Sequence, residues 1–243
     1  MNIYSPDSTA EAVILYDKGA FDRATHRFKR HIRIKILKPA GTRWGDWSFS
    51  TTNKSVFQGY VYNLEKGEIV KDKLEPNSIH KEEVINEFDV YKVFMPNVRV
   101  GSVVEIMYYF DGFPRKWEFQ HNIPTAYSEL EMDQTKYIIY KRNFYGLEPI
   151  QTLIPGRLWI AEQIPAMTTE PFMNHYSNYI TKFEFDIESI KVPGRYYRDF
   201  ATSWKAINNV LRQTPLFSSL LKETSFLNAF VKEVEQLGLT KKE

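Results

Sequence analysis

A two-residue alternation between Phe28 and Leu37 constrains the fold more than any other feature of the sequence. Phe28, Ile32, Ile34 and Ile36 fall on one parity of this stretch, and basic side chains fill the other parity. Side chains two residues apart share one face of a β-strand, so the pattern predicts a strand with one face on a core and one in water. The basic face comprises Arg27, Lys29, His31, Arg33 and Lys35.

Short segments of this kind recur along the chain up to about residue 190. Aromatic residues, which favour the pleated surface of a sheet, make up 15% of the sequence. No helical pattern separates the segments, so they predict a mostly β protein, an antiparallel β-sandwich rather than βαβ units. Asp17-Lys18-Gly19 is typical of a turn that ends the first strand. The other strands are expected over residues 56–64, 69–71, 87–94, 101–110, 125–133, 137–141, 158–163 and 179–187.

The pattern becomes helical near residue 203. Thr202 or Ser203 can cap a first amphipathic helix, and Thr224 or Ser225 can cap a second one. A helical stretch of this length is too short to form a core of its own. It is therefore expected either to dock on the sandwich or to begin a longer structure that this chain does not contain. The sequence therefore predicts a β-sandwich domain over residues 1–195 and a short C-terminal helical segment over residues 196–243.

Composition excludes several classes of function. The chain has 32 Lys and Arg and 30 Asp and Glu, and a net charge of +2 gives no reason to expect nucleic acid as the main partner. No apolar run is long enough to span a bilayer, and the N-terminal residues do not form an export signal. Cysteine is absent, which rules out disulfides, thiolate metal sites and a cysteine nucleophile in this chain. No phosphate loop, nucleophile elbow or zinc motif occurs, so the chain is expected to be non-catalytic, without metal or cofactor.

Two groups of residues are candidates for binding. The basic strand face could hold an anion or an acidic partner, or it could be a water-facing surface neutralised by neighbouring acids. Trp44, Trp47, Tyr60 and Tyr62 could form an aromatic platform for sugar rings, with Trp44 and Trp47 in a loop, or they could pack in the core or at its rim.

Paired carboxylates leave a catalytic alternative open. Glu129 and Glu131 share one strand face, and Glu184 and Asp186 share another. Two acids held across a cleft could perform general acid/base hydrolysis, whereas the same spacing also describes a solvated face. Glu129 and Glu131 could instead lie opposite the basic strand face as cross-strand partners.

An ordered set of weak motifs resembles a known family. The segments are residues 12–17 (AVILYD), 34–37 (IKIL), 96–105 (PNVRVGSVVE), 117–124 (WEFQHNIP), 128–129 (SE), 164–166 (IPA), 170–173 (EPFM) and 203–204 (SW). In order and spacing, they resemble the domain of unknown function 3857, which lies at the N-terminus of bacterial transglutaminase-like proteins, generally exported ones. The resemblance covers roughly residues 8 to 230.

The resemblance implies a β-sandwich accessory domain followed by a papain-like transglutaminase or protease domain. The family's catalytic Cys, His and Asp lie in that following domain, and none can be placed on this chain, which has no Cys. The helical segment resembles the lead-in to the catalytic domain. The expected role is to position or recruit substrate for that C-terminal domain in the periplasm or outside the cell, and the expected ligand is a protein or a glycan. The alternative function is a carbohydrate- or peptidoglycan-binding module that uses the surface aromatics.

Overall fold

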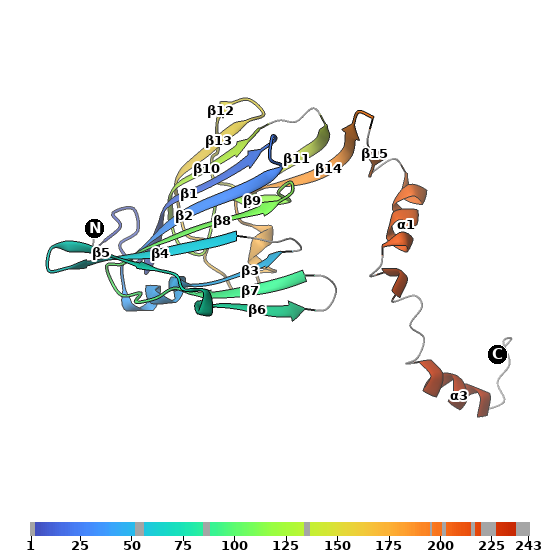
Figure 1. Ribbon diagram of the computed structural model, residues 1–243, viewed down its shortest axis with the longest axis horizontal. Helices are drawn as coiled ribbons and strands as arrows, with labels where there is room; N and C mark the ends of the chain where they lie inside the picture. The colour runs from blue at the N-terminus through green and yellow to red at the C-terminus, as the bar shows by residue number, and fades with distance from the viewer. Residues whose placement is uncertain are drawn as a thin grey trace. The chain divides into compact units, whose positions relative to one another are not determined.

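The chain folds mostly into strands that form a β-sandwich, followed by short helices (Figure 1). It divides into two compact units, Met1–Ile187 and Glu188–Glu243. The computed structural model describes residues 3–51, 56–84, 88–133, 137–194, 196–200, 203–214, 217–219 and 227–236. The expected fold class, a mostly β protein with a short C-terminal helical part, is confirmed.

An eight-stranded sheet is the larger layer of the first unit, with the strand order β12-β13-β10-β1-β2-β8-β4-β5. The strand pairs with a described register are antiparallel, except that β1 and β10 run parallel. The strands are β1 (Ala12–Asp22), β2 (Arg27–Ile36), β4 (Val56–Glu65), β5 (Glu68–Lys73), β8 (Val103–Asp111), β10 (Thr125–Met132), β12 (Gln151–Ile154) and β13 (Leu158–Ile164).

Two smaller sheets form the opposing layer. One has the order β3-β7-β6, and in the other β14 lies between β11 and β15 and also pairs with β9. Their strands are β3 (Asp46–Thr51), β6 (Ile79–Val84), β7 (Phe88–Phe94), β9 (Lys116–Glu118), β11 (Ile138–Tyr145), β14 (Lys182–Val192) and β15 (Tyr196–Asp199). Three 3-10 helices connect strands: η1 (Pro39–Gly45), η2 (Pro76–Ser78) and η3 (Tyr176–Asn178).

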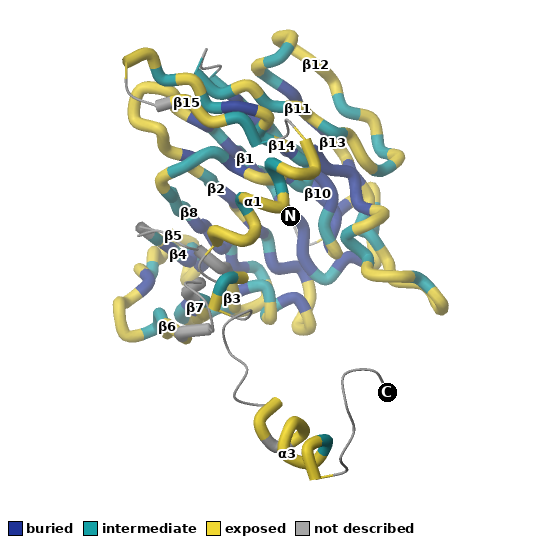
Figure 2. The backbone as a smooth tube through the Cα atoms, turned by 90° about the vertical axis from the view of Figure 1, so that its right-hand side faces the viewer, coloured by how far each residue is buried: buried dark blue, intermediate teal, exposed yellow. Residues whose placement is uncertain are grey.

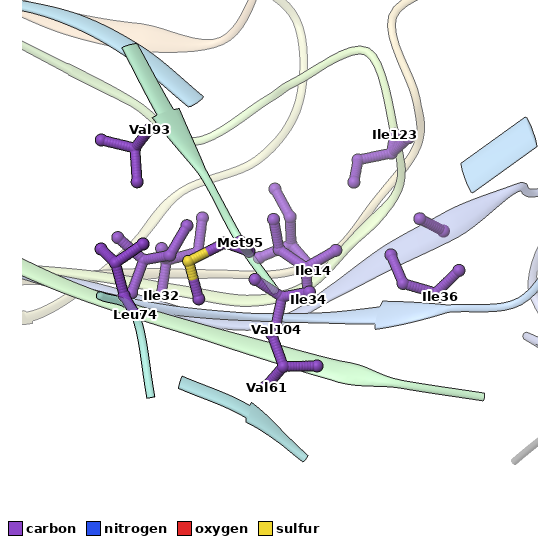
Figure 3. Packing of buried hydrophobic residues seen from close by; sticks show 12 residues of the cluster. Ile14, Ile32, Ile34, Ile36, Val61, Leu74, Val93, Met95, Val104 and Ile123 are labelled. Atoms are coloured by element: carbon purple, nitrogen blue, oxygen red, sulfur yellow. The ribbon is translucent and has the colours of Figure 1, made fainter. Parts of the chain in front are cut away.

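The apolar parity of β2 lies in the core, as the alternation predicts. Ile32, Ile34 and Ile36 are buried in a cluster that also contains Val93 and Met95 of the segment around β7 (Figure 3). Burial of each such side chain contributes on the order of 1.5–3 kcal/mol. This cluster joins the eight-stranded sheet to the sheet β3-β7-β6.

A second cluster joins the other half of the eight-stranded sheet to β9 and β14. Its members are largely aromatic, and Phe119, Phe183 and Phe185 meet in edge-to-face contacts with centroid separations of 5.2 Å and 6.3 Å. Edge-to-face pairs are favourable because the positive ring edge meets the negative ring face. Most of the buried aromatic side chains thus lie in this half of the sandwich.

The first strand does not end where the sequence predicts. Asp17-Lys18-Gly19 is expected to be a turn, but β1 continues through it to Asp22. Asp17 is fully buried and receives two hydrogen bonds from Arg30, which removes the cost of placing its charge inside. The turn falls instead after Asp22, at residues 23–26.

The described part of the second unit includes β15, the helix α1 (Trp204–Gln213), helical residues at 217–219 and the helix α3 (Asn228–Gln236). The expected helical segment from residue 196 is wrong at its start, because Tyr196–Asp199 pairs with the end of β14. Ser203 caps α1 as expected, its hydroxyl accepting a hydrogen bond from the Ala206 amide at 3.1 Å. Residue 195, the predicted end of the sandwich domain, lies outside the described residues. The other predicted helix caps, Thr202, Thr224 and Ser225, also lie outside them.

Apolar side chains are exposed on α1 and α3, and Figure 2 draws most of the described residues of these two helices as exposed. Trp204 is 86% exposed and Phe230 is 63% exposed. Within the described part of the chain, no helix has both the length and the apolar character that crossing a membrane requires.

Candidate binding face

The basic residues of β2 lie on the outer face of the eight-stranded sheet, away from the core clusters. The register places β1 on one side of β2 and β8 on the other, so His31 lies between Lys18 and Met107, and Arg33 lies between Tyr16 and Glu105. β4 follows β8, and Tyr60 lies opposite Glu105. The face therefore combines predicted basic and aromatic residues from strands that are far apart in sequence.

Glu105 is the centre of a polar cluster on this face. Its carboxylate is nearly buried and lies 2.7 Å from His31 Nε2 and 2.9 Å from Arg33 Nε, and it accepts a hydrogen bond from the Tyr62 hydroxyl at 2.6 Å. Burial alone would raise the pKa of Glu105, but the hydrogen bonds from Tyr62, His31 and Arg33 lower it to about 2. Glu105 therefore stays ionised and neutralises the middle of the basic strand.

Two of the other three basic side chains on this face also have interaction partners. Arg27 donates to Asp111 at 2.8 Å and lies 5.0 Å from the centre of the Tyr109 ring. The Lys35 ammonium donates to the Gly101 carbonyl. Among the described residues, Lys29 has no acidic partner. Lys29 is thus the member of this basic face for which neither an acid nor a carbonyl partner is found among the described residues.

The structure does not bring the four candidate aromatic residues together. Tyr60 and Tyr62 lie on the outer face, with ring centroids 6.5 Å apart and planes inclined at 45°. The Lys71 ammonium lies 3.8 Å from the centre of the Tyr60 ring, in the place where a sugar would stack. The joint platform is therefore wrong as a geometric prediction.

Trp44 and Trp47 lie on the opposite side of the sheet from the two tyrosines. Both pack against the core cluster that contains Ile32 and Ile34. Trp44 belongs to η1 and Trp47 to β3, so the expectation of a single loop is also wrong. Trp47 donates from Nε1 to the Trp44 backbone carbonyl at 3.2 Å, which ties the Trp47 ring to the end of η1.

The candidate carboxylates also fall on different surfaces. Glu129 pairs with Lys18 at 2.6 Å and Glu131 pairs with Arg157 at 3.0 Å, on the eight-stranded sheet. The expected pairing of these two acids with the basic strand face is wrong, because β10 neighbours β1 rather than β2. The other two acids, Glu184 and Asp186, lie on β14 in a different sheet, where Glu184 meets Lys182 and Asp186 accepts from Asn143.

A second cluster on the outer face was not anticipated from the sequence. The Tyr16 and Tyr127 rings stack with planes inclined at 3° and centroids 6.0 Å apart, and the Tyr127 hydroxyl donates to Glu129 at 2.7 Å. Burial and this hydrogen bond raise the pKa of Tyr127. Tyr16 and Tyr127 come from the parallel pair β1 and β10, whose pairing no local pattern reveals.

A buried charged group lies between the two core clusters. Arg30 binds Asp17 through two hydrogen bonds of 2.8 Å and 2.6 Å, and His121 Nε2 lies 3.3 Å from the same carboxylate. The Arg30 guanidinium also lies against the Trp47 ring at 5.8 Å and the Trp117 ring at 5.1 Å. Burial would raise the pKa of Asp17, but Arg30 and His121 hold it below its usual range. In the sequence, this charged group is indicated by Arg30, a basic residue among the apolar, inward-facing positions of β2.

Metal binding has no visible basis in the described part of the chain. Within it, no three His, Asp or Glu side chains group so that they could hold an ion. Among the described residues, the outer face therefore carries ion pairs, phenol hydroxyls and lysines, Lys29 among them, that have no acidic partner.

Comparison with known proteins supports the fold. No protein-family model matches the sequence, and no curated protein matches it. Among solved structures, the chain is similar to a candidate protease from Parabacteroides distasonis, with 13% identity and a TM-score of 0.62 over 90% of this chain and 46% of that chain.

Native yeast LTA4 hydrolase also matches, with 10% identity and a TM-score of 0.35 over 77% of this chain and 31% of that one. Its complex with bestatin matches with 8% identity and a TM-score of 0.34, over 74% and 29% of the two chains. The yeast matches are too low in TM-score to support an argument. The likeness to the bacterial protein shows a shared fold, and this chain spans less than half of that protein's length.

Proposed function

We propose that this chain is a non-catalytic accessory module of a transglutaminase-like protein, which positions or recruits substrate for a catalytic domain. The catalytic domain of such an enzyme supplies a Cys nucleophile, and this chain contains no Cys. The resemblance to the domain of unknown function 3857 supplies the expected partner and an exported location.

The exposed apolar side chains of α1 and α3 carry the proposal. Trp204 and Leu211 of α1 and Phe230 and Val231 of α3 are between 48% and 86% exposed. Helices of nine or ten residues are marginal in water, and most of their stability comes from packing an apolar face. We infer that these faces pack against a further domain of the longer protein.

The fold likeness supports the same proposal. The Parabacteroides distasonis protein is described as a candidate protease, and 46% of its length corresponds to this chain. A shared sandwich in a protein of about twice the length is the arrangement expected of an accessory domain beside a catalytic one.

The test begins with the native reading frame past Glu243. We expect it to encode a domain with Cys, His and Asp in that order. Removing residues 1–195 from the longer protein should preserve turnover of a small ester or amide and strongly reduce turnover of a protein substrate. A reading frame that ends at Glu243, or a deletion protein with unchanged activity on both substrates, would overturn the proposal.

The helices can be tested separately in the same longer protein. Trp204→Ser and Phe230→Ser should lower its melting temperature by several degrees, because each removes apolar contact with the further domain. Asn208→Ser on α1 is the matched control, since Asn208 is exposed and polar. Equal melting temperatures for all three variants would argue against docking through these faces.

A further inference from the structure

The outer face of the eight-stranded sheet contains a pocket of about 470 Å³ near the turn between β1 and β2. This volume lies in the range of roughly 300–1,000 Å³ that small-molecule sites occupy. Lys29, Gln58 and Tyr109 are among the residues that line it. These residues come from three neighbouring strands, β2, β4 and β8, so the rigid sheet fixes their spacing.

The register explains why the face is hollow here. Ala20 of β1 lies opposite Lys29, and Tyr109 of β8 lies opposite it on the other side. The small side chain of Ala20 leaves space beside the lysine, and Met107 adds an apolar surface next to Gln58. The pocket therefore has a cation, an amide, an aromatic ring and an apolar wall.

The charge of Lys29 is not compensated within the described chain. The nearby Arg27 is paired with Asp111 at 2.8 Å. Asp22 also lines the pocket, but its two carboxylate oxygens accept from the Ala24 amide at 2.8 Å and the Thr25 hydroxyl at 2.9 Å. These hydrogen bonds hold the Asp22 carboxylate in the turn, and among the described residues Lys29 forms no ion pair with it or with any other acid.

We propose that this pocket binds the C-terminal carboxylate of a peptide. Lys29 would pair with the carboxylate, and a charge-assisted hydrogen bond of this kind is about twice as strong as a neutral one. The Gln58 amide carries both a donor and an acceptor, which match a peptide group, and Met107 with Tyr109 gives an apolar surface for the terminal side chain. The site is independent of any neighbouring catalytic domain, so its failure leaves the accessory role untouched.

The test is calorimetric titration of the purified chain with N-acetylated leucylalanine, as the free acid and as the C-terminal amide. The free acid should bind at least about tenfold more tightly than the amide, because only the acid forms the ion pair. Equal affinity for both forms, or no heat at millimolar concentrations of the acid, would overturn the proposal. Glucuronate binding as tightly as the peptide acid would overturn the assignment to a peptide.

Matched variants locate the binding. Lys29→Gln should reduce affinity for the acid at least about fivefold, whereas Lys29→Arg keeps the charge and should stay within about threefold. Ala20→Leu fills the pocket and should abolish binding. Lys73→Gln removes the same charge from an exposed position on β5, outside the pocket, and should change nothing. An equal loss in Lys73→Gln and Lys29→Gln would reduce the effect to net charge and overturn the site.

Discussion

At the scale of single residues, two carboxylates determine how charge is arranged in the sandwich. Glu105 lies on the outer face, where Tyr62, His31 and Arg33 surround it. Asp17 lies between the core clusters and depends on Arg30. Both acids are ionised because specific donors outweigh the cost of burial, so both make stability sensitive to the loss of a donor or of the charge.

Breaking the buried pair should be costly. Arg30→Leu leaves the Asp17 charge buried without its main partner, and we expect the free energy of unfolding to fall by roughly 3–5 kcal/mol. The double variant Asp17→Leu with Arg30→Leu should recover part of this loss, because no buried charge remains. Urea denaturation measures both. A loss below about 1 kcal/mol in the single variant would show that the pair is not the stabilising contact we describe.

Glu105 should make stability fall in acid. The pKa of Glu105 is lowered to about 2 in the folded protein. Its contribution to the free energy of unfolding is therefore complete above the pKa of the unfolded state and is lost as the pH falls toward 2. The full contribution is roughly 3 kcal/mol. Urea denaturation between pH 6 and about pH 2.5 should therefore show a shallower pH dependence for Glu105→Gln than for the wild type. Parallel profiles for the two proteins would refute the assignment.

At the scale of elements, contacts with other strands explain why β1 continues beyond the turn that the sequence predicts. The segment Asp17-Lys18-Gly19 favours a turn, but it stays in the strand. Asp17 accepts hydrogen bonds from Arg30, and Gly19 packs closely against the Trp117 ring. A Cβ atom on Gly19 would lie 2.5 Å from the Trp117 ring and 2.8 Å from the Phe28 ring. The missing side chain is thus a packing requirement of the inner face.

Gly19→Ala should therefore destabilise the protein by about 1–3 kcal/mol, because two large rings must move. Gly19→Val should lower the free energy of unfolding by more than Gly19→Ala does. Thermal unfolding gives the comparison, with Lys29→Ala on the neighbouring strand as an exposed control expected within about 0.5 kcal/mol of the wild type. Wild-type stability in Gly19→Ala would mean that the Trp117 ring has room to move.

At the scale of the whole molecule, the two units differ in how they are stabilised. The described residues of the first unit form three buried clusters, whereas the described helices of the second unit expose their apolar side chains. Short helices without a packed face are only marginally stable in water. The second unit therefore has the properties expected of a segment that completes its packing on another domain.

Hydrogen exchange should reveal this difference. Amides in α1 and α3 should exchange orders of magnitude faster than those of β2 and β8 in this chain. In the longer protein proposed above, the same helix amides should become protected. Helix amides as slow as those of β2 in the chain alone would contradict the expected marginal stability.

The sequence by itself determined those features that depend on near neighbours. The alternation of β2 placed Ile32, Ile34 and Ile36 in the core, and Ser203 capped α1. The strands expected over residues 56–64 and 69–71 are β4 and β5, which pair as a hairpin with Lys66 and Gly67 at positive φ in the turn. Periodicity, capping and turn chemistry act within a few residues, so a single sequence reveals them.

Only the tertiary structure decided which residues meet across the sheets. Tyr62 meets Glu105 on the outer face of the eight-stranded sheet, whereas Trp44 and Trp47 pack against the core on the inner face. Arg30 lies among the inward-facing apolar residues of β2, where it binds Asp17. These outcomes follow from strand order and from the parallel pairing of β1 with β10, which join segments about a hundred residues apart. Such pairings depend on the free energy of the whole core, and no local pattern encodes them.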